Sequence, residues 1–149
     1  MRIAVGSDEA TALTEEITEA LRTAGHELDL LGPLSGDDRE WAAVSAETGR
    51  RVSGGACETA VLFCWSGTGA AIAANKVPGV RAALCGDPET ARLARKYNHA
   101  NVLVMSLRAT SPAVGREITE AFLDEPLGAD DFDRRNVAHV DALDADGRS

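Results

Sequence analysis

The sequence predicts an α/β fold in which helices cover both faces of a parallel sheet. Segments typical of strands and segments typical of helices alternate along the chain, as in strands joined by helical crossovers. The run from Val61 to Phe63 is continuously apolar, which is typical of a strand buried on both faces. Asp87-Pro88 and Ser111-Pro112 are typical helix starts, because Asp and Ser cap helices and Pro suits the first turn.

Five strands are expected from short apolar runs. Ile3 and Val5 mark the first strand, which ends beside a glycine. The thiol of Cys64 falls where the third strand ends. The expected ranges are Met1 to Ser7, Glu27 to Leu31, a strand from Thr59 ending at Cys64, Val80 to Cys85, and Val102 to Met105.

Five helices are expected between and after these strands. Apolar residues recur at helical spacing before Gly25, which ends the first helix. Residues 32–38 are expected to form a loop. A polar tail from Asp130 to Asp144 is expected to be partly helical, and residues from about 145 to 149 to be frayed. The expected helices are Thr11 to Ala24, Glu40 to Val52, Ala70 to Lys76, Pro88 to about Tyr97, and Pro112 to about Leu123.

Composition limits the classes of protein that the chain can belong to. Its 149 residues have the length of one ordinary domain, residues 1–149, and 44% of them are hydrophobic, enough for a core. The formal net charge of −9 argues against a general nucleic-acid binder. A phosphate ligand stays compatible with that charge, because it needs only a few local arginines.

No apolar run approaches the ~20 residues of a membrane span, and no signal peptide precedes the first strand. Cys57, Cys64 and Cys85 are an odd number of cysteines, which does not suggest a disulfide scaffold. A cytoplasmic protein that binds neither membrane nor nucleic acid is therefore expected.

The candidate site lies between the third strand and the helix that follows it. Ser66, Gly67, Thr68 and Gly69 form a turn that can bring backbone amides close to a ligand. In open α/β sheets, ligands bind beyond the carboxyl ends of the strands. Cys64 lies there as a possible base or nucleophile, although a free Cys is equally often a small buried hydrophobe.

The glycine turn alone is a weak signal. It lacks the Gly-Lys-Ser/Thr of a P-loop, and Ile72 stands where the third glycine of a dinucleotide fingerprint belongs. Asp8 and Glu9 could bind substrate hydroxyls, but capping of the first helix is their commoner role. Trp41 is of a type found more often in a core than in a ligand site.

Charged residues elsewhere also have two interpretations. Arg108 and Arg135 could bind phosphate, although most arginines are simply solvated. His26, His99 and His139 are scattered, without the spacing of a metal site.

Four segments together make the chain resemble a known family. They are IAVGSD at 3–8, CWSGTGAAIAANKVPGVRAALC at 64–85, DPETARLARKYNHANVLVMSLR at 87–108 and RNVAHVDAL at 135–143. With them, nearly the whole chain resembles the ribose-5-phosphate isomerase B family, which includes galactose-6-phosphate isomerases. The resemblance implies a Rossmann-like three-layer α/β/α sandwich with a five-stranded parallel sheet. It also implies a homodimer with shared active sites, and an aldose–ketose isomerisation through a cis-enediolate with no metal or organic cofactor.

The resemblance assigns roles to individual residues. Cys64 falls on the family's cysteine base, and Ser66 on a threonine that handles the sugar ring oxygen. Asn98 falls on an asparagine near the substrate carbonyl. The amides of Gly67, Thr68, Gly69 and Ala70 would bind the developing oxyanion, and Arg108 and Arg135 fall on phosphate-binding arginines.

Four positions depart from the family pattern. Glu9 stands where a histidine is usual, and Tyr97 stands where the family has the histidine that opens the furanose ring. His139 replaces a second phosphate-side arginine, and Trp41 replaces a tyrosine. These departures bear on the choice of substrate, whereas Cys64 and the glycine turn are retained.

The leading hypothesis is an isomerase of a sugar phosphate of the ribose 5-phosphate/ribulose 5-phosphate type. One alternative is the same chemistry on another substrate, such as a tetrose phosphate. A second alternative is a sugar-phosphate-binding protein that has lost turnover. Dinucleotide binding is the weakest alternative, because the fingerprint is incomplete.

Overall fold

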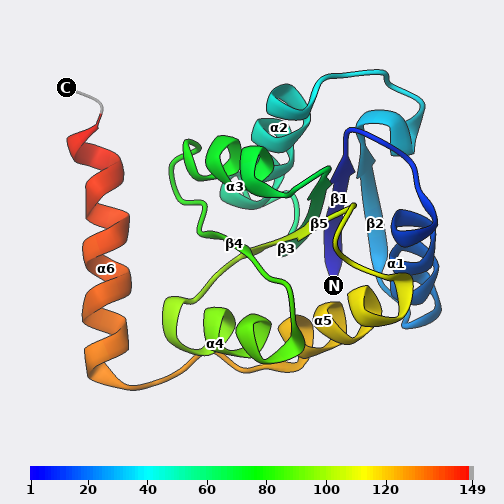
Figure 1. The fold of residues 1–149 in the computed structure, drawn as a ribbon. Coiled ribbons are helices and arrows are strands. Elements are labelled where there is room, and N and C mark those ends of the chain that lie inside the picture. Colours follow the sequence, from blue (N-terminus) through cyan, green and yellow to red (C-terminus); the bar gives the residue numbers. More distant parts are fainter. Residues whose placement is uncertain (148–149) are drawn as a thin grey trace.

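A computed structural model describes residues 1–147 of the chain. Five parallel strands form one sheet in the order β2-β1-β3-β5-β4 (Figure 1). Every neighbouring pair is parallel, which confirms the five-stranded parallel sheet expected from the sequence. The strands are β1 (Arg2–Ser7), β2 (Glu27–Leu31), β3 (Thr59–Cys64), β4 (Ala82–Leu84) and β5 (Val102–Ser106).

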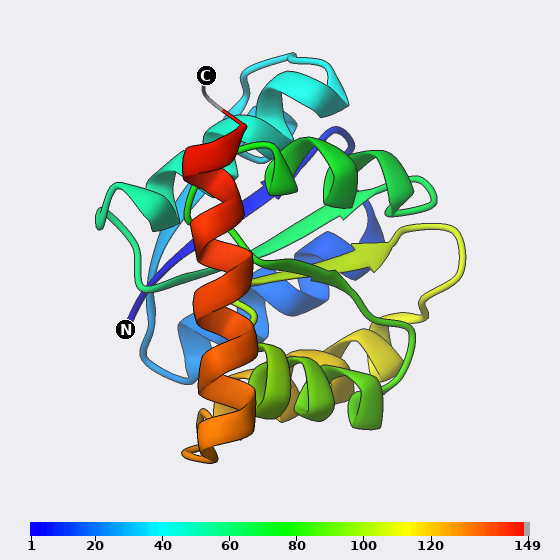
Figure 2. The ribbon, with the colours of Figure 1, turned by 90° about the vertical axis from the view of Figure 1, so that its left-hand side faces the viewer.

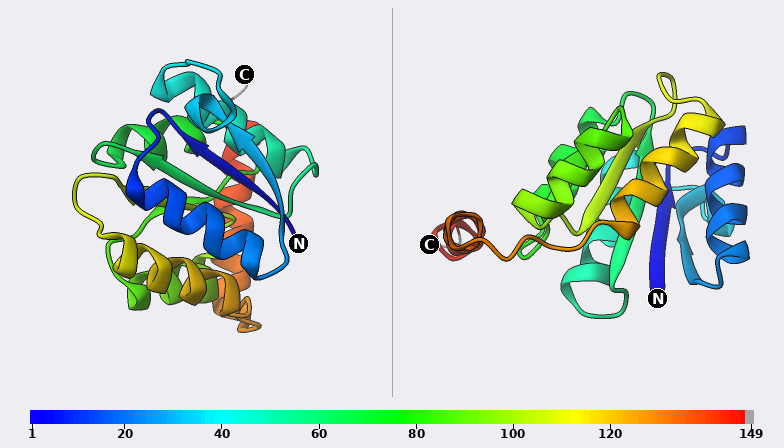
Figure 3. Two further views of the ribbon diagram at one scale, coloured as in Figure 1. Left: turned by 90° about the vertical axis from the view of Figure 1, so that its right-hand side faces the viewer. Right: turned by 90° about the horizontal axis from the view of Figure 1, so that it is seen from below.

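Helices cover both faces of the sheet, so the fold is the expected Rossmann-like three-layer sandwich (Figures 1 and 3). One buried cluster joins the sheet to α1, α4 and α5, and the other joins it to α2 and α3. A short 3₁₀ helix, η1, follows β2. The bounds are α1 (Ala12–Thr23), η1 (Gly32–Ser35), α2 (Trp41–Ser53), α3 (Thr68–Asn75), α4 (Pro88–Asn98), α5 (Pro112–Asp124) and α6 (Asp131–Asp146).

Burial on both faces explains why the central strand β3 is apolar from Ala60 to Cys64. All six of its residues are buried. Val61 and Phe63 belong to the cluster under α1, α4 and α5, while Ala60 and Leu62 belong to the cluster under α2 and α3. Since both faces are covered, both sets of alternating side chains are apolar after Thr59, whose hydroxyl donates to Asn101 O at 2.8 Å.

The expected caps of α4 and α5 are confirmed. Asp87 accepts hydrogen bonds from the backbone N–H and the hydroxyl of Thr90, at 2.8 and 2.6 Å. The Ser111 hydroxyl accepts from Val114 N at 3.2 Å. Each cap is followed by Pro in the first turn, as the sequence predicts.

Most boundaries lie within one or two residues of those expected, and the differences at β4 and after β2 have clear causes. The strand predicted from Val80 to Cys85 is shorter, because Arg81 N donates to the side chain of Asn101 instead of to a neighbouring strand. The segment predicted as a loop begins with the 3₁₀ turn η1.

The C-terminal helix is more regular than expected. It continues to Asp146, so the expected fraying is wrong for residues 145 and 146. Residues 148–149, also expected to fray, lie outside the described residues. Asp144 accepts from Gly79 N at 2.7 Å, and this bond holds the last turns against the body.

Helix α6 lies apart from the three layers. Figure 1 shows it beside the β4 end of the body, and Figure 2 shows it running across that edge. It has no buried residue, and Phe132, Val140 and Leu143 are exposed. No helix within residues 1–147 combines the length and the apolar composition needed to cross a membrane.

Candidate active site

The candidate site lies at the point where the strand order reverses. From β1 and β3 at the centre of the sheet, the chain goes to β2 on one side, and on the other side to the edge strand β4 before it returns to β5. Ligands of open α/β sheets bind outside the carboxyl ends of the strands at such a point. Ser7 pairs with Phe63, so the next residues, Asp8 and Cys64, lie side by side at this edge.

Cys64 is the last residue of β3 and is only 6% exposed. It belongs to the apolar cluster that includes Leu62 and Ala70. Its carbonyl accepts from Leu107 N at 2.9 Å, which ties the end of β3 to the loop after β5. The residue thus packs as a small hydrophobe while its thiol lies at the strand end where a ligand would bind.

The other two cysteines are poor candidates for the base. Burial raises the pKa of the Cys85 thiol to about 11, and the nearby Asp87 carboxylate adds to the shift. Burial, followed by the charge of Asp29, also raises the pKa of Cys57. Both thiols are therefore held in their protonated, weakly nucleophilic form.

The turn after Cys64 requires glycine at Gly67. Its φ of 81° lies in the left-handed region, and a Cβ there would lie 2.5 Å from Leu84 Cδ1. Next to it, the hydroxyls of Ser66 and Thr68 form a hydrogen bond of 2.8 Å. The turn thereby presents two hydroxyls at the start of α3.

The first amides of α3 are available to a ligand. The helix's first backbone hydrogen bond runs from Ala71 N to Gly67 O at 3.1 Å, so the amides of Thr68, Gly69 and Ala70 have no acceptor within the helix. Within residues 1–147, no side chain caps them. Such amides, at the positive end of the helix, are suited to binding an anionic oxygen.

Trp41 lies against this turn. A Cβ on Gly69 would be 2.9 Å from Trp41 Cζ3, so the indole closely covers the backbone of that glycine. The residue is 46% exposed, which contradicts its interpretation as a core residue. Because it begins α2, its ring reaches from the neighbouring element to the edge of the site.

Asp8 does not cap α1. Thr11 is the N-cap and forms a reciprocal capping box with Thr14, so capping by Asp8 or Glu9 is wrong. The Ser7 hydroxyl instead fixes the turn by donating to Glu9 O at 2.6 Å. Glu9 itself is exposed.

The side chain of Asp8 is oriented for a ligand. Its Oδ1 is buried and has no hydrogen-bond partner within residues 1–147. The residue lines an open hollow of about 670 Å³ together with Asp38, Arg39, Glu40 and Trp41. A buried carboxylate oxygen without a donor is costly, and a sugar hydroxyl would supply that donor.

Arg108 is placed near the turn by its backbone. Its N–H donates to Trp65 O at 3.0 Å, and the Ser106 hydroxyl donates to the same carbonyl at 2.9 Å. The Arg108 side chain is exposed, and no carboxylate within residues 1–147 forms an ion pair with it. A cation that is free of partners is available to a phosphate.

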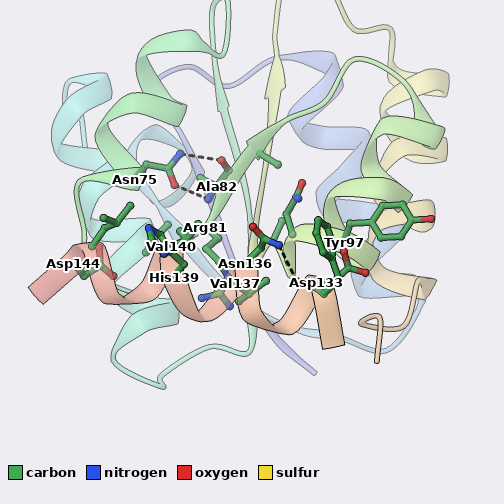
Figure 4. A pocket seen from close by; sticks show the side chains of 16 residues that line it. Asn75, Arg81, Ala82, Tyr97, Asp133, Asn136, Val137, His139, Val140 and Asp144 are labelled. Atoms are coloured by element: carbon green, nitrogen blue, oxygen red, sulfur yellow. Dashed lines mark hydrogen bonds between the residues drawn. The ribbon is translucent and has the colours of Figure 1, made fainter. Parts of the chain in front are cut away.

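The other residues predicted for the site lie on or beside α6, away from Cys64. A groove of about 860 Å³ separates α6 from the body, and Tyr97, Asn98 and His139 line it (Figure 4). Cys64 and the turn after it are not among the residues that line this groove. Arg135 is exposed on α6. One chain therefore brings Asp8, Cys64, Ser66 and Arg108 to the carboxyl edge but leaves Arg135 and His139 on a separate helix.

Sequence reasoning missed two residues of this edge. Ser106 pairs in register with Cys64 and fixes the carbonyl of Trp65. It could have been found, because Ser106 ends an apolar strand there, as Ser7 ends β1. Arg39 lines the hollow beside Asp8 and has no motif that would predict it.

No three His, Cys, Asp or Glu side chains within residues 1–147 come close enough together to hold a metal ion. A doubly wound sheet with a carboxylate, a thiol and unpaired amides at its switch point defines a Rossmann-like α/β protein of the class that binds small polar ligands. The family model described as Ribose/Galactose Isomerase matches residues 3–142, and the chain belongs to that family.

Three relatives show the range of substrates within similar proteins. Ribose-5-phosphate isomerase B of Escherichia coli K12 is 33% identical over 145 residues, covering 97% of this chain and 95% of the relative. D-erythrulose-4-phosphate isomerase of Pectobacterium atrosepticum is 34% identical over 126 residues, 83% of each chain. The 4-deoxy-4-sulfo-D-erythrose isomerase of a Clostridium strain is 34% identical over 128 residues, 83% of this chain and 79% of the relative.

Solved structures agree with this membership. Ribose-5-phosphate isomerase B of Clostridium thermocellum superposes with a TM-score of 0.91 at 27% identity, covering 99% of both chains. The Mycoplasma genitalium enzyme with bound ribulose 5-phosphate has a TM-score of 0.88 at 27% identity, covering 99% of this chain and 97% of that one.

Proposed function

We propose that the protein is an aldose–ketose isomerase that acts on a sugar phosphate and uses Cys64 as its base. The observation that carries the proposal is the position of Cys64 at the switch point of the sheet, followed directly by the unpaired amides of α3. Family membership supports the reaction class, since the relatives described above are named as isomerases of sugar phosphates or of a sulfo sugar.

The reaction moves hydrogen within one molecule, so it consumes no oxidant or reductant. The thiolate of Cys64 removes the proton from C2 of the open-chain aldose, and the C1 carbonyl oxygen becomes an enediolate oxygen. The same thiol returns the proton to C1, while the O2 hydroxyl proton is transferred to O1 and C2 becomes the carbonyl. Amides of Gly67, Thr68, Gly69 and Ala70 stabilise the negative oxygen. Asn98 lines the groove beside α6 and not the edge that carries Cys64, so in this proposal it donates near the carbonyl of the substrate bound by the partner subunit.

Hydroxyl and carboxylate groups orient the sugar in this proposal. Ser66, which is hydrogen-bonded to Thr68 at 2.8 Å, handles the ring oxygen of a cyclic substrate. The buried Oδ1 of Asp8 accepts from a substrate hydroxyl. The family resemblance assigns substrate-facing positions to Glu9 and Tyr97, of which Tyr97 lines the groove beside α6.

The phosphate is bound by arginines from two subunits. Arg108 follows β5 at the carboxyl edge, whereas Arg135 and His139 are carried by α6. We propose a homodimer in which α6 reaches the site of its partner, so that Arg135 binds the phosphate there and His139 assists. The exposed apolar residues Phe132, Val140 and Leu143 support this arrangement, because α6 buries no residue against its own chain.

A four-carbon sugar phosphate is the second candidate substrate, beside ribose 5-phosphate. The family resemblance puts Tyr97 at the position of the ring-opening histidine, and a phenol is a poorer proton shuttle at neutral pH than an imidazole. Two relatives are named for four-carbon sugars, which supports this candidate.

Substitution of the base tests the proposed function. Cys64→Ser keeps the shape but offers a hydroxyl that is far too weakly acidic, so kcat should fall by about 10²- to 10⁴-fold with the fold intact. Cys85→Ala is the matched control, because it removes another buried thiol outside the site. The assay screens tetrose, pentose and hexose phosphates. Full activity of Cys64→Ser would disprove the role of the base, and binding without turnover in the wild type would indicate a non-catalytic protein.

A further inference from the structure

Helix α6 is attached to the body at two places, and these determine where its side chains are carried. At the distal end, Asp141 forms an ion pair with Arg81 at 2.7 Å, and Asp144 accepts from Gly79 N at 2.7 Å. At the near end, the linker between α5 and α6 is fixed to α4, where Gly128 N donates to Lys96 O at 2.9 Å. Figure 4 shows Arg81 and Asp144 where α6 passes the body.

His99 takes part in both attachments. Its ring nitrogen Nε2 lies 2.9 Å from Gly128 O, an acceptor, so the ring donates to the linker. Its backbone carbonyl accepts from Arg81 Nε at 2.9 Å, and the same guanidinium pairs with Asp141. The backbone of Arg81 is in turn fixed by Asn101, whose Oδ1 accepts from Arg81 N at 2.7 Å.

The backbone conformation of His99 supports a specific role. It is the only non-glycine residue within 1–147 with a positive φ, 50°, and it ends α4 directly after Tyr97 and Asn98. Left-handed conformations cost energy for residues with a side chain and persist where the surroundings enforce them. The linker also packs tightly against α4 at Gly128, because a Cβ at that position would lie 2.5 Å from Lys96 O.

We propose that His99 is a positioning residue that fixes α6 relative to the last turn of α4, and thereby places Arg135 for binding of the substrate phosphate. This inference rests on the proposed function. The contacts of His99 join the turn that carries Tyr97 and Asn98 to the helix that carries Arg135 and His139. An unfixed α6 would leave the arginine intact but spread its position, so phosphate binding would weaken while proton transfer at Cys64 stays unchanged.

His99→Gly tests the proposal, because it removes the ring but keeps the left-handed backbone accessible. We expect KM for the sugar phosphate to rise about threefold to tenfold, the range for a lost hydrogen bond, with kcat nearly unchanged. The inhibition constant of inorganic phosphate should rise by the same factor. Hydrogen exchange of α6 amides should become faster, which is a readout independent of turnover.

Four further variants complete the experiment. Gly128→Ala should raise KM as His99→Gly does, because it disturbs the other partner of the contact between His99 and Gly128. The double variant His99→Gly/Gly128→Ala should have a KM no higher than that of either single variant, since both substitutions remove the same contact. His99→Gln, which keeps a donor of similar reach, should restore KM in part. His26→Ala is the matched control, because His26 is bonded to the N-terminus, away from α6.

The outcomes separate this proposal from the proposed function. If His99→Gly is an active enzyme with unchanged KM and unchanged hydrogen exchange of the α6 amides, the role of His99 is overturned and the proposed function is not. A fall of kcat with KM unchanged would also contradict it. Absence of turnover in the wild type would overturn the proposed function, and the phosphate-binding part of this inference with it.

Discussion

At the scale of single residues, the two candidate phosphate ligands share one property. Arg108 and Arg135 are exposed, and neither has an ion-pair partner within residues 1–147. Arg92, by contrast, is paired with Glu89 at 3.1 Å, as are most arginines of the surface with nearby carboxylates. In a chain of formal net charge −9, unpaired arginines are the natural anion ligands.

Removal of either arginine should therefore weaken substrate binding. Arg108→Ala and Arg135→Ala should each raise KM by about 10- to 100-fold, the value of a lost charge-assisted hydrogen bond, with a smaller effect on kcat. Arg92→Ala is the control with an equally exposed arginine, and its kinetics should be those of the wild type. Equal turnover of unphosphorylated and phosphorylated sugars would show that the ligand needs no phosphate.

Single residues also mark where sequence reasoning succeeds. Cys64 could be placed at the strand end because the apolar run stops there and a glycine turn follows. The role of Asp8 could not be decided, because Thr11 also suits the N-cap, and only its capping box with Thr14 excludes Asp8. Trp41 is predicted as a core residue because its side chain is largely apolar. Its contact with Gly69 depends on how α2 and α3 pack, which no local sequence pattern encodes.

At the scale of elements, local signals predict helix starts well and strand ends less well. The Asp87 cap is formed within four residues, so the sequence contains all of it. The start of β4 depends on Asn101, which lies 20 residues from Arg81 in the chain. The ladder stops where this side chain replaces a backbone partner, and propensity alone extends the strand to Val80.

The cap of α4 makes a prediction about acid stability. The hydroxyl and then the backbone N–H of Thr90 hold the pKa of Asp87 below its ordinary value of 3.8. Because the folded pKa is depressed, the stabilisation is present above the unfolded pKa and is lost as pH falls through the folded pKa. Asp87→Asn can still cap but does not titrate, so the advantage of the wild type should shrink below about pH 4.

Urea unfolding from pH 7 to pH 2.5 measures this difference. Ser111→Ala is the matched control, since it removes an uncharged cap of α5 and should lower stability by a similar amount at every pH. A difference between wild type and Asp87→Asn that is constant over this range would contradict the assignment.

At the scale of the whole molecule, α6 is the part that sequence could not place. Its helical tendency can be read from residues 130–144, but its apolar residues are too few for a core of its own. Its position depends on Arg81 and Gly79, which lie about 60 residues earlier in the chain. The layers of the sandwich, in contrast, follow from alternating local patterns and the burial of β3.

The proposed homodimer predicts activity from mixed subunits. At substrate concentrations well below KM, the Cys64→Ser and Arg135→Ala dimers should each keep at most about a tenth of the wild-type rate. A dimer of one with the other has one site with both residues intact. After unfolding and refolding together, the mixture should regain about a quarter of wild-type activity, since half of the dimers are mixed and each has one good site. Sedimentation should show a dimer at micromolar concentration. A monomer, or no gain on mixing, would contradict shared sites.

The substrate is decided by the whole site, because the open-chain form must reach Cys64. Pentose phosphates spend most of their time as rings, whereas a sugar phosphorylated at the fourth carbon cannot close a furanose. By the family resemblance, Tyr97 stands where a ring-opening histidine is usual, and Glu9 adds a negative charge next to Asp8. We therefore expect kcat/KM for erythrose or erythrulose 4-phosphate to exceed that for ribose 5-phosphate. Tyr97→His should raise the value for ribose 5-phosphate only. A clear preference of the wild type for ribose 5-phosphate, with no gain from Tyr97→His, would mean that Ser66 or Glu9 opens the ring instead.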